Sequence, residues 1–308
     1  TVADPNVQSP QPTQSLEMLL ESTTQQLAGE LLSSRIDAYI QLVGMWKSYE
    51  DVPDCDALAG KLDTLCYFIQ RDVTRDFEKE NVMERNLVIS ALKLGILLSC
   101  NKSISMQLPD EFRVFMIDHA LNALQECKLP KAVLNLFAHV LAQEFPPKIL
   151  TASRCTRILS VMSDIHSRVS GTNILIYRLN VYHHLPKTIL ASHPELWIEN
   201  LIAALLNSAS VIRSRAIDVA HRIIAELGPN AAVSKTVLDY FDKELPDGHR
   251  MVSEIRTRML ARLMTPVESG VHVPQIWAIL VLLMRSRKFR IEQWHHFKEW
   301  TLIVQKCF

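Results

Sequence analysis

Four cations fall within six residues near the end of the sequence: Arg285, Arg287, Lys288 and Arg290. They lie between two expected helices, so one connecting segment carries all of them. Several cations on such a segment can neutralise successive phosphates and release their counterions, which gives sequence-independent binding to nucleic acid. A solvated turn contains the same residue types, so a DNA contact and an ordinary connecting turn both remain open interpretations.

A second basic set consists of arginines on the second helices of two neighbouring helix pairs. Such helices usually line the concave surface of a stacked array, so these arginines could form one continuous anion-binding groove. Asp218 and Glu226 lie at helical spacing from Arg222, however, and local ion pairs on a solvated helix are the alternative. The predicted groove residues are Arg213, Arg215, Arg222, Arg256, Arg258 and Arg262.

Two histidine pairs, His183-His184 and His295-His296, raise the question of a metal site. Adjacent residues on a helix point about 100° apart, and no Glu-x-x-His motif or cysteine lies at ligand spacing from either pair. We therefore expect no metal and no other cofactor. The sequence also lacks a Gly-x-Ser-x-Gly motif, a glycine-rich phosphate loop and a recognisable Cys/His dyad. Together these features predict a binding protein and not an enzyme.

Composition predicts a helical protein with an uneven charge distribution. Hydrophobic residues make up 48% of the chain and only 8 of 308 residues are glycine, which suits helices and leaves little for β-hairpins. Residues 1–110 contain 9 Lys and Arg against 16 Asp and Glu, so this part carries a net charge of −7 and the remainder +7. The C-terminal part could therefore bind an anionic partner. No uncharged apolar run approaches the roughly 18 residues of a membrane span, so we expect none.

The six cysteines are scattered, with no C-x-x-C motif and most of them at apolar helix positions. We expect free, buried thiols in a reducing compartment rather than disulfides or a zinc site.

The basic residues must be positioned by helices, and residues 194–228 show the pattern most clearly. Apolar residues recur there at three- and four-residue spacing on both sides of a polar turn at 207–210, which predicts two helices. Gly228-Pro229 is a typical helix end. Neither helix could bury its apolar face alone, so similar pairs are expected on both sides, as in a helical solenoid.

The same pattern recurs along the chain. We predict an all-α fold, a HEAT/armadillo-like α-solenoid of about seven helix pairs over residues 15–308, preceded by a flexible segment at 1–14. The charged residues 71–80 are expected to be a solvated helix end and loop. A short echo between residues 34–39 and 214–219 supports an internal repeat. The expected pairs are 15–30 with 34–49, 54–72 with 81–100, 110–127 with 130–146, 151–168 with 173–191, 194–206 with 212–227, 230–245 with 249–264, and 273–284 with 291–304.

Two resemblances extend this interpretation. Ile212-Arg213 followed by Ala216 resembles the start of a second HEAT helix, although the aspartate that usually precedes it is missing. Residues 18–42 resemble the start of the N-terminal HEAT-like domain of Rap-interacting factor (Rif) proteins of filamentous fungi, where an ESxTQQLAGExxSSRIDAY phrase occurs. Later segments resemble the same family in the same order: 68–72, 114–119, 175–178 and the helix around Trp197.

The Rif resemblance implies a non-enzymatic chromatin protein in the nucleus, at chromosomes and telomeres. It implies binding to DNA or to phosphorylated partners, and roles in telomere length, replication timing and the handling of broken DNA ends. Protein phosphatase 1 would be recruited through motifs outside this chain. Residues 113–116 are not such a motif, because they lack an aromatic residue at the required spacing and lie inside an apolar helix pattern. The alternative is an interaction solenoid that binds a phosphorylated peptide or another copy of itself, with DNA contacted elsewhere.

Overall fold

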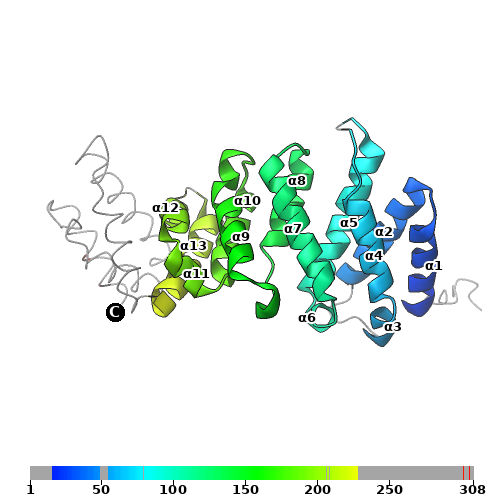
Figure 1. Ribbon diagram of the computed structural model, residues 1–308, viewed down its shortest axis with the longest axis horizontal. Helices are drawn as coiled ribbons and strands as arrows, with labels where there is room; N and C mark the ends of the chain where they lie inside the picture. The colour runs from blue at the N-terminus through cyan, green and yellow to red at the C-terminus, as the bar shows by residue number, and fades with distance from the viewer. Residues whose placement is uncertain are drawn as a thin grey trace, which may run out of the picture. The chain divides into compact units, whose positions relative to one another are not determined.

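The computed structural model describes residues 16–48, 55–78, 80–205, 207, 209–227, 301 and 305. Every regular element in this part of the chain is a helix, and it contains no strand, which confirms the predicted all-α class (Figure 1). The predicted flexible segment 1–14 and the predicted sixth and seventh helix pairs lie outside the described residues.

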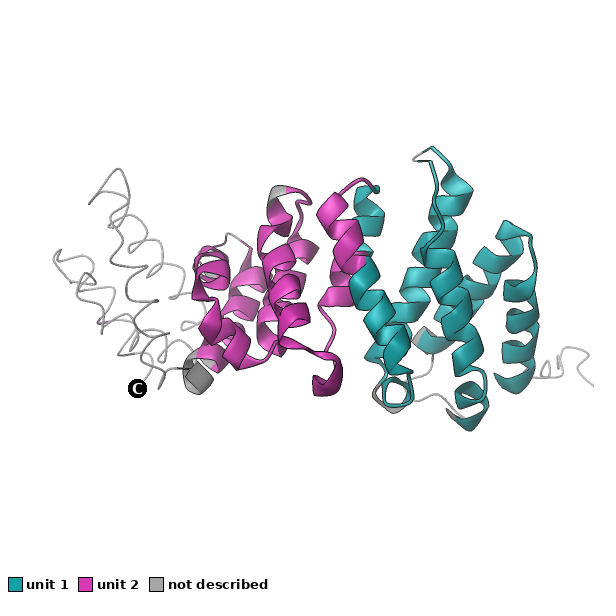
Figure 2. Ribbon diagram, viewed as in Figure 1, with its two compact units in different colours: residues 1–119, 129–136 teal, residues 120–128, 137–308 magenta. Residues whose placement is uncertain are grey.

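The chain divides into two compact units, coloured separately in Figure 2. Unit 1 comprises residues 1–119 and 129–136, and unit 2 comprises 120–128 and 137–308. The division crosses two helices, α7 (Asp110–Glu126) and α8 (Lys131–Leu141). Each unit is described by itself below.

Unit 1 is built around α2, which packs against α1 and α5, while α4 also packs against α5. The buried residues of α4 recur at three- and four-residue spacing, as expected for a helix with one apolar face, whereas α5 is buried around most of its circumference between Leu87 and Leu98. Asn81 caps α5 by accepting a hydrogen bond from the backbone N–H of Glu84 at 3.2 Å. Its helices are α1 (Leu16–Ala28), α2 (Leu32–Ser48), α3 (Cys55–Ala59), α4 (Leu62–Val73), α5 (Val82–Cys100), α6 (Lys102–Ser105) and the first parts of α7 and α8.

Unit 2 is built around α13, which packs against α10, α11 and α12. Trp197 fills the core at 2% exposure, and its indole N–H donates to the carbonyl of Leu190 at 2.9 Å. Its helices are the end of α7, the end of α8, η1 (Pro147–Ile149), α9 (Ala152–Asp164), η2 (Ile165–Ser167), α10 (Thr172–His184), α11 (Lys187–Ser192), α12 (Pro194–Leu205) and α13 (Ser210–Leu227).

Two expected helices are interrupted. The segment expected at 54–72 forms α3 and α4, which are separated at Gly60-Lys61. The segment expected at 173–191 forms α10 and α11, which are separated at Leu185-Pro186. Proline lacks an N–H and restricts the residue before it, so α10 must end there. The other expected helices within the described residues begin and end within a few residues of their predicted bounds, apart from the shorter α8 and α9.

The residues that correspond between α2 and α13 differ by two positions from those that the short sequence echo pairs. Arg35 and Arg213 are each the fourth residue of their helix, both are buried, and each donates to the carbonyl six residues earlier, Gly29 and Asn207, at 2.6 and 3.0 Å. The alanines three residues further on, at 38 and 216, are both fully buried. Arg35 therefore corresponds to Arg213 and not to Arg215, the residue that the echo in the sequence pairs with it.

Candidate anion-binding cluster

Three of the ten arginines and lysines predicted to bind anions lie among the described residues, all on α13 of unit 2. Arg213 is only 6% exposed, and its guanidinium donates to the carbonyl of Asn207. The side chain is therefore buried against the turn before α13. The predicted residues outside the described part are Arg256, Arg258, Arg262, Arg285, Arg287, Lys288 and Arg290.

Arg215 and Arg222 instead reach toward the C-terminal half of α10. Arg215 donates through Nε to Oδ1 of Asn180 at 2.8 Å, and Arg222 donates through Nη1 to Nε2 of His183. The two arginines are seven residues apart on α13, so they share one face of that helix. The groove predicted between this helix and residues 256–262 stays a prediction, because its second half lies outside the described residues.

Lys187 brings a third cation to the same place. Its ammonium donates to the carbonyls of Tyr182 and His183, at 3.2 and 2.9 Å, at the end of α10. These carbonyls have no partner within the helix, so a lysine there is a favourable C-terminal cap. Pro186 makes this possible because it ends α10 and starts α11 at Lys187. We call the resulting group the α10–α13 cluster: His183, His184, Lys187, Arg215 and Arg222.

Both histidines of the cluster are neutral at pH 7. Burial lowers the pKa of His183, and Arg215, Arg222, His184 and Lys187 lower it further, to about 4. Burial is also the main cause that lowers the pKa of His184, while Glu144 opposes it. Burial lowers the pKa of Arg215 as well, and Asp218 opposes that effect. The cations therefore lower the pKa of both imidazoles, and Glu144 offsets this effect at His184.

The contact with Arg222 fixes the proton on His183. A guanidinium can only donate, so Nε2 must be the accepting nitrogen and the neutral ring must carry its proton on Nδ1. Nδ1 is buried and has no hydrogen-bond partner among the described residues. An imidazole with one nitrogen held by a cation and the other without a partner can rearrange its hydrogen bonds when a ligand arrives.

The cluster offers N–H donors and positive charge, which suit an oxyanion such as a phosphate. The described residues contain no group of three or more His, Cys, Asp or Glu side chains that could hold a metal ion. The expectation for His183-His184 considered only metal and so missed their place in this cluster, as it missed Lys187. The available signal was two histidines in the last turn of a helix that a proline ends.

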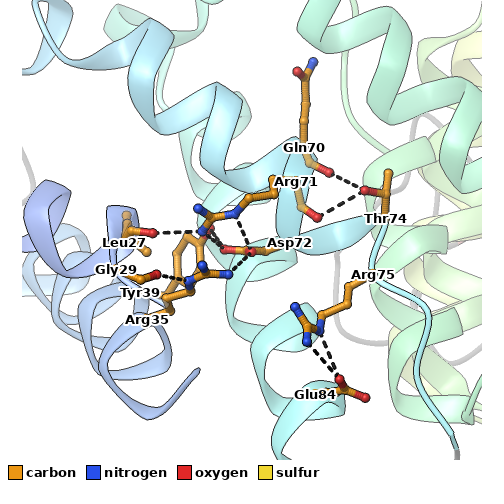
Figure 3. A network of polar contacts seen from close by, with 10 residues as sticks. All are labelled: Leu27, Gly29, Arg35, Tyr39, Gln70, Arg71, Asp72, Thr74, Arg75 and Glu84. Atoms are coloured by element: carbon orange, nitrogen blue, oxygen red, sulfur yellow. Dashed lines mark hydrogen bonds and ion pairs between the residues drawn. The ribbon is translucent and has the colours of Figure 1, made fainter. Parts of the chain in front are cut away.

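Unit 1 contains a polar network of the opposite kind, shown in Figure 3, in which cations surround a buried acid. Asp72 is 1% exposed and accepts from Arg35 at 3.3 Å and from the Tyr39 hydroxyl at 2.8 Å. The guanidinium of Arg71 pairs with both carboxylate oxygens, at 2.9 and 2.8 Å. The prediction of a solvated segment from residue 71 is therefore wrong at its start, where Asp72 is interior.

Backbone carbonyls complete this network. Arg35 also donates to Gly29, and Arg71 donates to Leu27 at 2.9 Å (Figure 3). The group therefore ties the end of α1 to α2 and α4 without leaving a guanidinium for a ligand. Burial raises the pKa of Tyr39, and the neighbouring carboxylate raises it further, so the hydroxyl keeps its proton and donates it to Asp72. We assign a structural role to the network.

Comparison with known proteins places these features in a family. Residues 27–308 match the family described as Rap1-interacting factor 1 N terminal. The chain belongs to this family. It is also 28% identical over 279 residues to the telomere length regulator protein rif1 of Schizosaccharomyces pombe, which is 90% of this chain and 19% of that protein. The chain thus spans about a fifth of the length of this curated relative.

The Rap1-interacting factor 1 N terminal match includes the whole of both polar groups. The Asp72 network joins two of the segments that resemble Rif proteins in the sequence, 18–42 and 68–72, so part of that resemblance describes packing between α2 and α4.

None of the helices in the described residues combines the length and apolar character that a bilayer crossing requires.

Proposed function

We propose that this chain is a non-enzymatic helical array that binds DNA through phosphate contacts, as part of a nuclear protein that controls telomere length. Membership of the Rap1-interacting factor 1 N terminal family and the similarity to a fission yeast telomere length regulator support this role. The same proposal includes replication timing, protection of DNA ends, and recruitment of protein phosphatase 1 by other parts of the protein.

The observation that carries the proposal is the convergence of Lys187, Arg215 and Arg222 on one face of unit 2. Arginine and lysine contacts to phosphate supply most of the affinity in sequence-independent DNA binding. Arg222 is exposed and Arg215 and Lys187 are half-buried, so their charged ends can reach a ligand at the surface. The seven further predicted cations at 256–262 and 285–290 would extend this surface along the chain.

We further propose that the helices form a HEAT-type array. Arg35 and Arg213 occupy the same position in α2 and α13, each bonded to the carbonyl six residues before it. In such an array the second helices of successive pairs line one surface, so cations on them can follow a DNA backbone.

DNA binding can be tested by fluorescence anisotropy with a labelled duplex of about 20 base pairs at low salt. The variant K187Q/R215Q/R222Q should bind more weakly, and the slope of log affinity against log salt should fall by about 0.9 for each phosphate that the variant no longer neutralises. The matched control K128Q/R157Q/R168Q removes three cations from another part of unit 2. Equal binding by the wild type and the cluster variant would contradict the assignment of DNA to this cluster.

The second basic segment needs a test of its own. We propose that Arg285, Arg287 and Lys288 also contact DNA. Replacing all three with glutamate should weaken duplex binding strongly at low salt, because three attractive contacts become repulsive. Unchanged binding would exclude this segment from the DNA surface, whatever the result for the α10–α13 cluster.

A phosphorylated partner protein is the second candidate, because the three cations of the α10–α13 cluster converge on one place and could surround a single phosphate group. A phosphoserine peptide that displaces DNA, while its unphosphorylated form does not, would favour this candidate. Self-association, the third outcome, would appear as a concentration-dependent mass in light scattering and would be abolished in R215Q/R222Q.

A further inference from the structure

We propose that His183 is itself a ligand-binding residue, and that it takes up one proton from solvent when an oxyanion binds at the α10–α13 cluster. This inference rests on the proposed function and names how the same site would recognise its ligand. Its basis is the geometry of His183, Arg222 and their neighbours.

The free protein holds His183 in a form that cannot donate from Nε2. That nitrogen accepts a hydrogen bond from Arg222, so its lone pair is occupied and the ring is neutral. The remaining proton lies on Nδ1, which is buried without a partner among the described residues. The free ring therefore has one nitrogen held by Arg222 and one buried N–H without a partner among the described residues.

Besides burial, the charged groups among the described residues that shift the pKa of His183 are all basic. They come from three helices: His184 on α10, Lys187 on α11, and Arg215 and Arg222 on α13. The acids of the neighbourhood act elsewhere, Glu144 on His184 and Asp218 on Arg215. Positive charge around an imidazole opposes its protonation, and an anion placed among these cations reverses that effect.

The binding step can be written without breaking a covalent bond. The oxyanion accepts the N–H of Arg222 that previously pointed at Nε2, which frees the lone pair of that nitrogen. A proton from solvent then adds to Nε2, and the new N–H donates to an anion oxygen. One proton is taken up for each anion bound, and the imidazolium adds a charge-assisted hydrogen bond.

Proton uptake makes binding depend on pH. The bound state holds one more proton than the free state, so binding strengthens as the pH falls between the pKa of the bound form and the free-state value of about 4. For one proton the limit is a tenfold change in affinity for each pH unit, since a pKa unit corresponds to a factor of ten in an equilibrium constant.

Isothermal titration calorimetry with duplex DNA gives the number of protons directly. Phosphodiesters do not titrate in this range, so uptake is obtained from the binding heat in buffers of different ionisation enthalpy at about pH 5.5, between the free-state pKa of about 4 and the ordinary range for histidine. We expect the wild type to take up close to one proton at this site. H183Q should bind the duplex without taking up that proton, whereas the control H166Q, at an exposed histidine outside the cluster, should retain the uptake. Equal uptake by wild type and H183Q, or binding of the wild type without uptake, would overturn the inference.

A second measurement separates this inference from DNA binding. The imidazole signal of His183 can be titrated by NMR in sodium sulfate and in sodium chloride at equal ionic strength. Sulfate should raise the midpoint for His183 above its value in chloride, and R222Q should raise it in chloride alone because a cation is removed and Nε2 is freed. If the wild type fails to bind DNA, the proposed function fails, and the sulfate titration still decides whether His183 responds to an oxyanion. A midpoint that sulfate does not move would overturn the inference.

Discussion

In unit 1 two arginines and a tyrosine point at one buried carboxylate, whereas in unit 2 two arginines and a lysine surround a pair of neutral histidines. The first group satisfies its charges internally and ties three helices together. In the second group the residue that Arg222 contacts is an imidazole and not an acid, and Arg215 donates to an amide oxygen. The comparison shows that arginines of this fold serve both a buried carboxylate and neutral acceptors nearer the surface.

The largest expected effect is at Asp72. Replacing it with asparagine removes the charge on which Arg35 and Arg71 converge, and breaking a buried ion pair on one side costs about 3–5 kcal/mol. Urea unfolding of D72N should therefore show a free energy of unfolding lower by about 3 kcal/mol or more. The control D63N, at an exposed position of α4, should stay within about 0.5 kcal/mol. Similar values for both variants would refute the structural role of the network.

A smaller effect is expected at the two corresponding arginines. R213M removes the charge-assisted bond to the carbonyl of Asn207 and should cost about 1.5–3 kcal/mol. R35M removes bonds to Gly29 and to Asp72 together, so its cost should be clearly larger. Thermal unfolding of the two variants side by side measures this difference. A larger loss of stability in R213M than in R35M would contradict the correspondence between these two arginines.

The pH dependence of stability tests the neutral histidine. The pKa of His183 is about 4 in the folded protein, below the ordinary value of 6.5, so the unfolded chain binds more protons between these values. Stability must therefore fall as the pH is lowered from about 6.5 toward 4, by at most about 1.4 kcal/mol per pH unit for one proton.

Urea unfolding of H183Q at several pH values should show a shallower decline than the wild type. Part of the slope should remain, because burial also lowers the pKa of His119, His139 and His184. Replacing the exposed His166 provides the control. Parallel curves for H183Q and the wild type would mean that folding does not lower the pKa of His183.

The smallest effect is expected at Arg222, whose side chain is exposed. R222Q should change the free energy of unfolding by no more than about 0.5 kcal/mol, the usual range for surface substitutions. Together with a loss of DNA affinity, this result would sharpen the contrast with unit 1. A destabilisation as large as that of R213M would instead give Arg222 a structural role.

The sequence predicted much of the helical pattern because local signals set it. Prolines and polar turns mark the starts of α7, α8 and α12, and the apolar spacing locates α1, α2 and α5. The break in the segment at 173–191 also had a local signal, Pro186, which the strong apolar pattern on both sides concealed. The break at Gly60 was harder to predict, since a glycine inside a helical pattern is often tolerated.

The polar groups could not be predicted in the same way. Asp72 accepts from residues 33 and 37 positions away, and Arg222 reaches a histidine 39 positions away. Such pairs depend on how the helices pack, which the periodicity of one helix does not contain. Arg213 illustrates this difficulty. Its apolar neighbours Ile212 and Ala216 predict that this face of the helix is buried, whereas its charge led to the prediction of an anion-binding position.

The position of α1 has a practical consequence for anyone who expresses parts of this chain. The family match begins at residue 27, but α1 begins at Leu16 and packs against α2, α3 and α4. A fragment cut at the family boundary would strip away nearly the whole first helix, including Leu20 and Thr23, and leave apolar surface open to water. Recombinant fragments of this protein should therefore start upstream of Leu16.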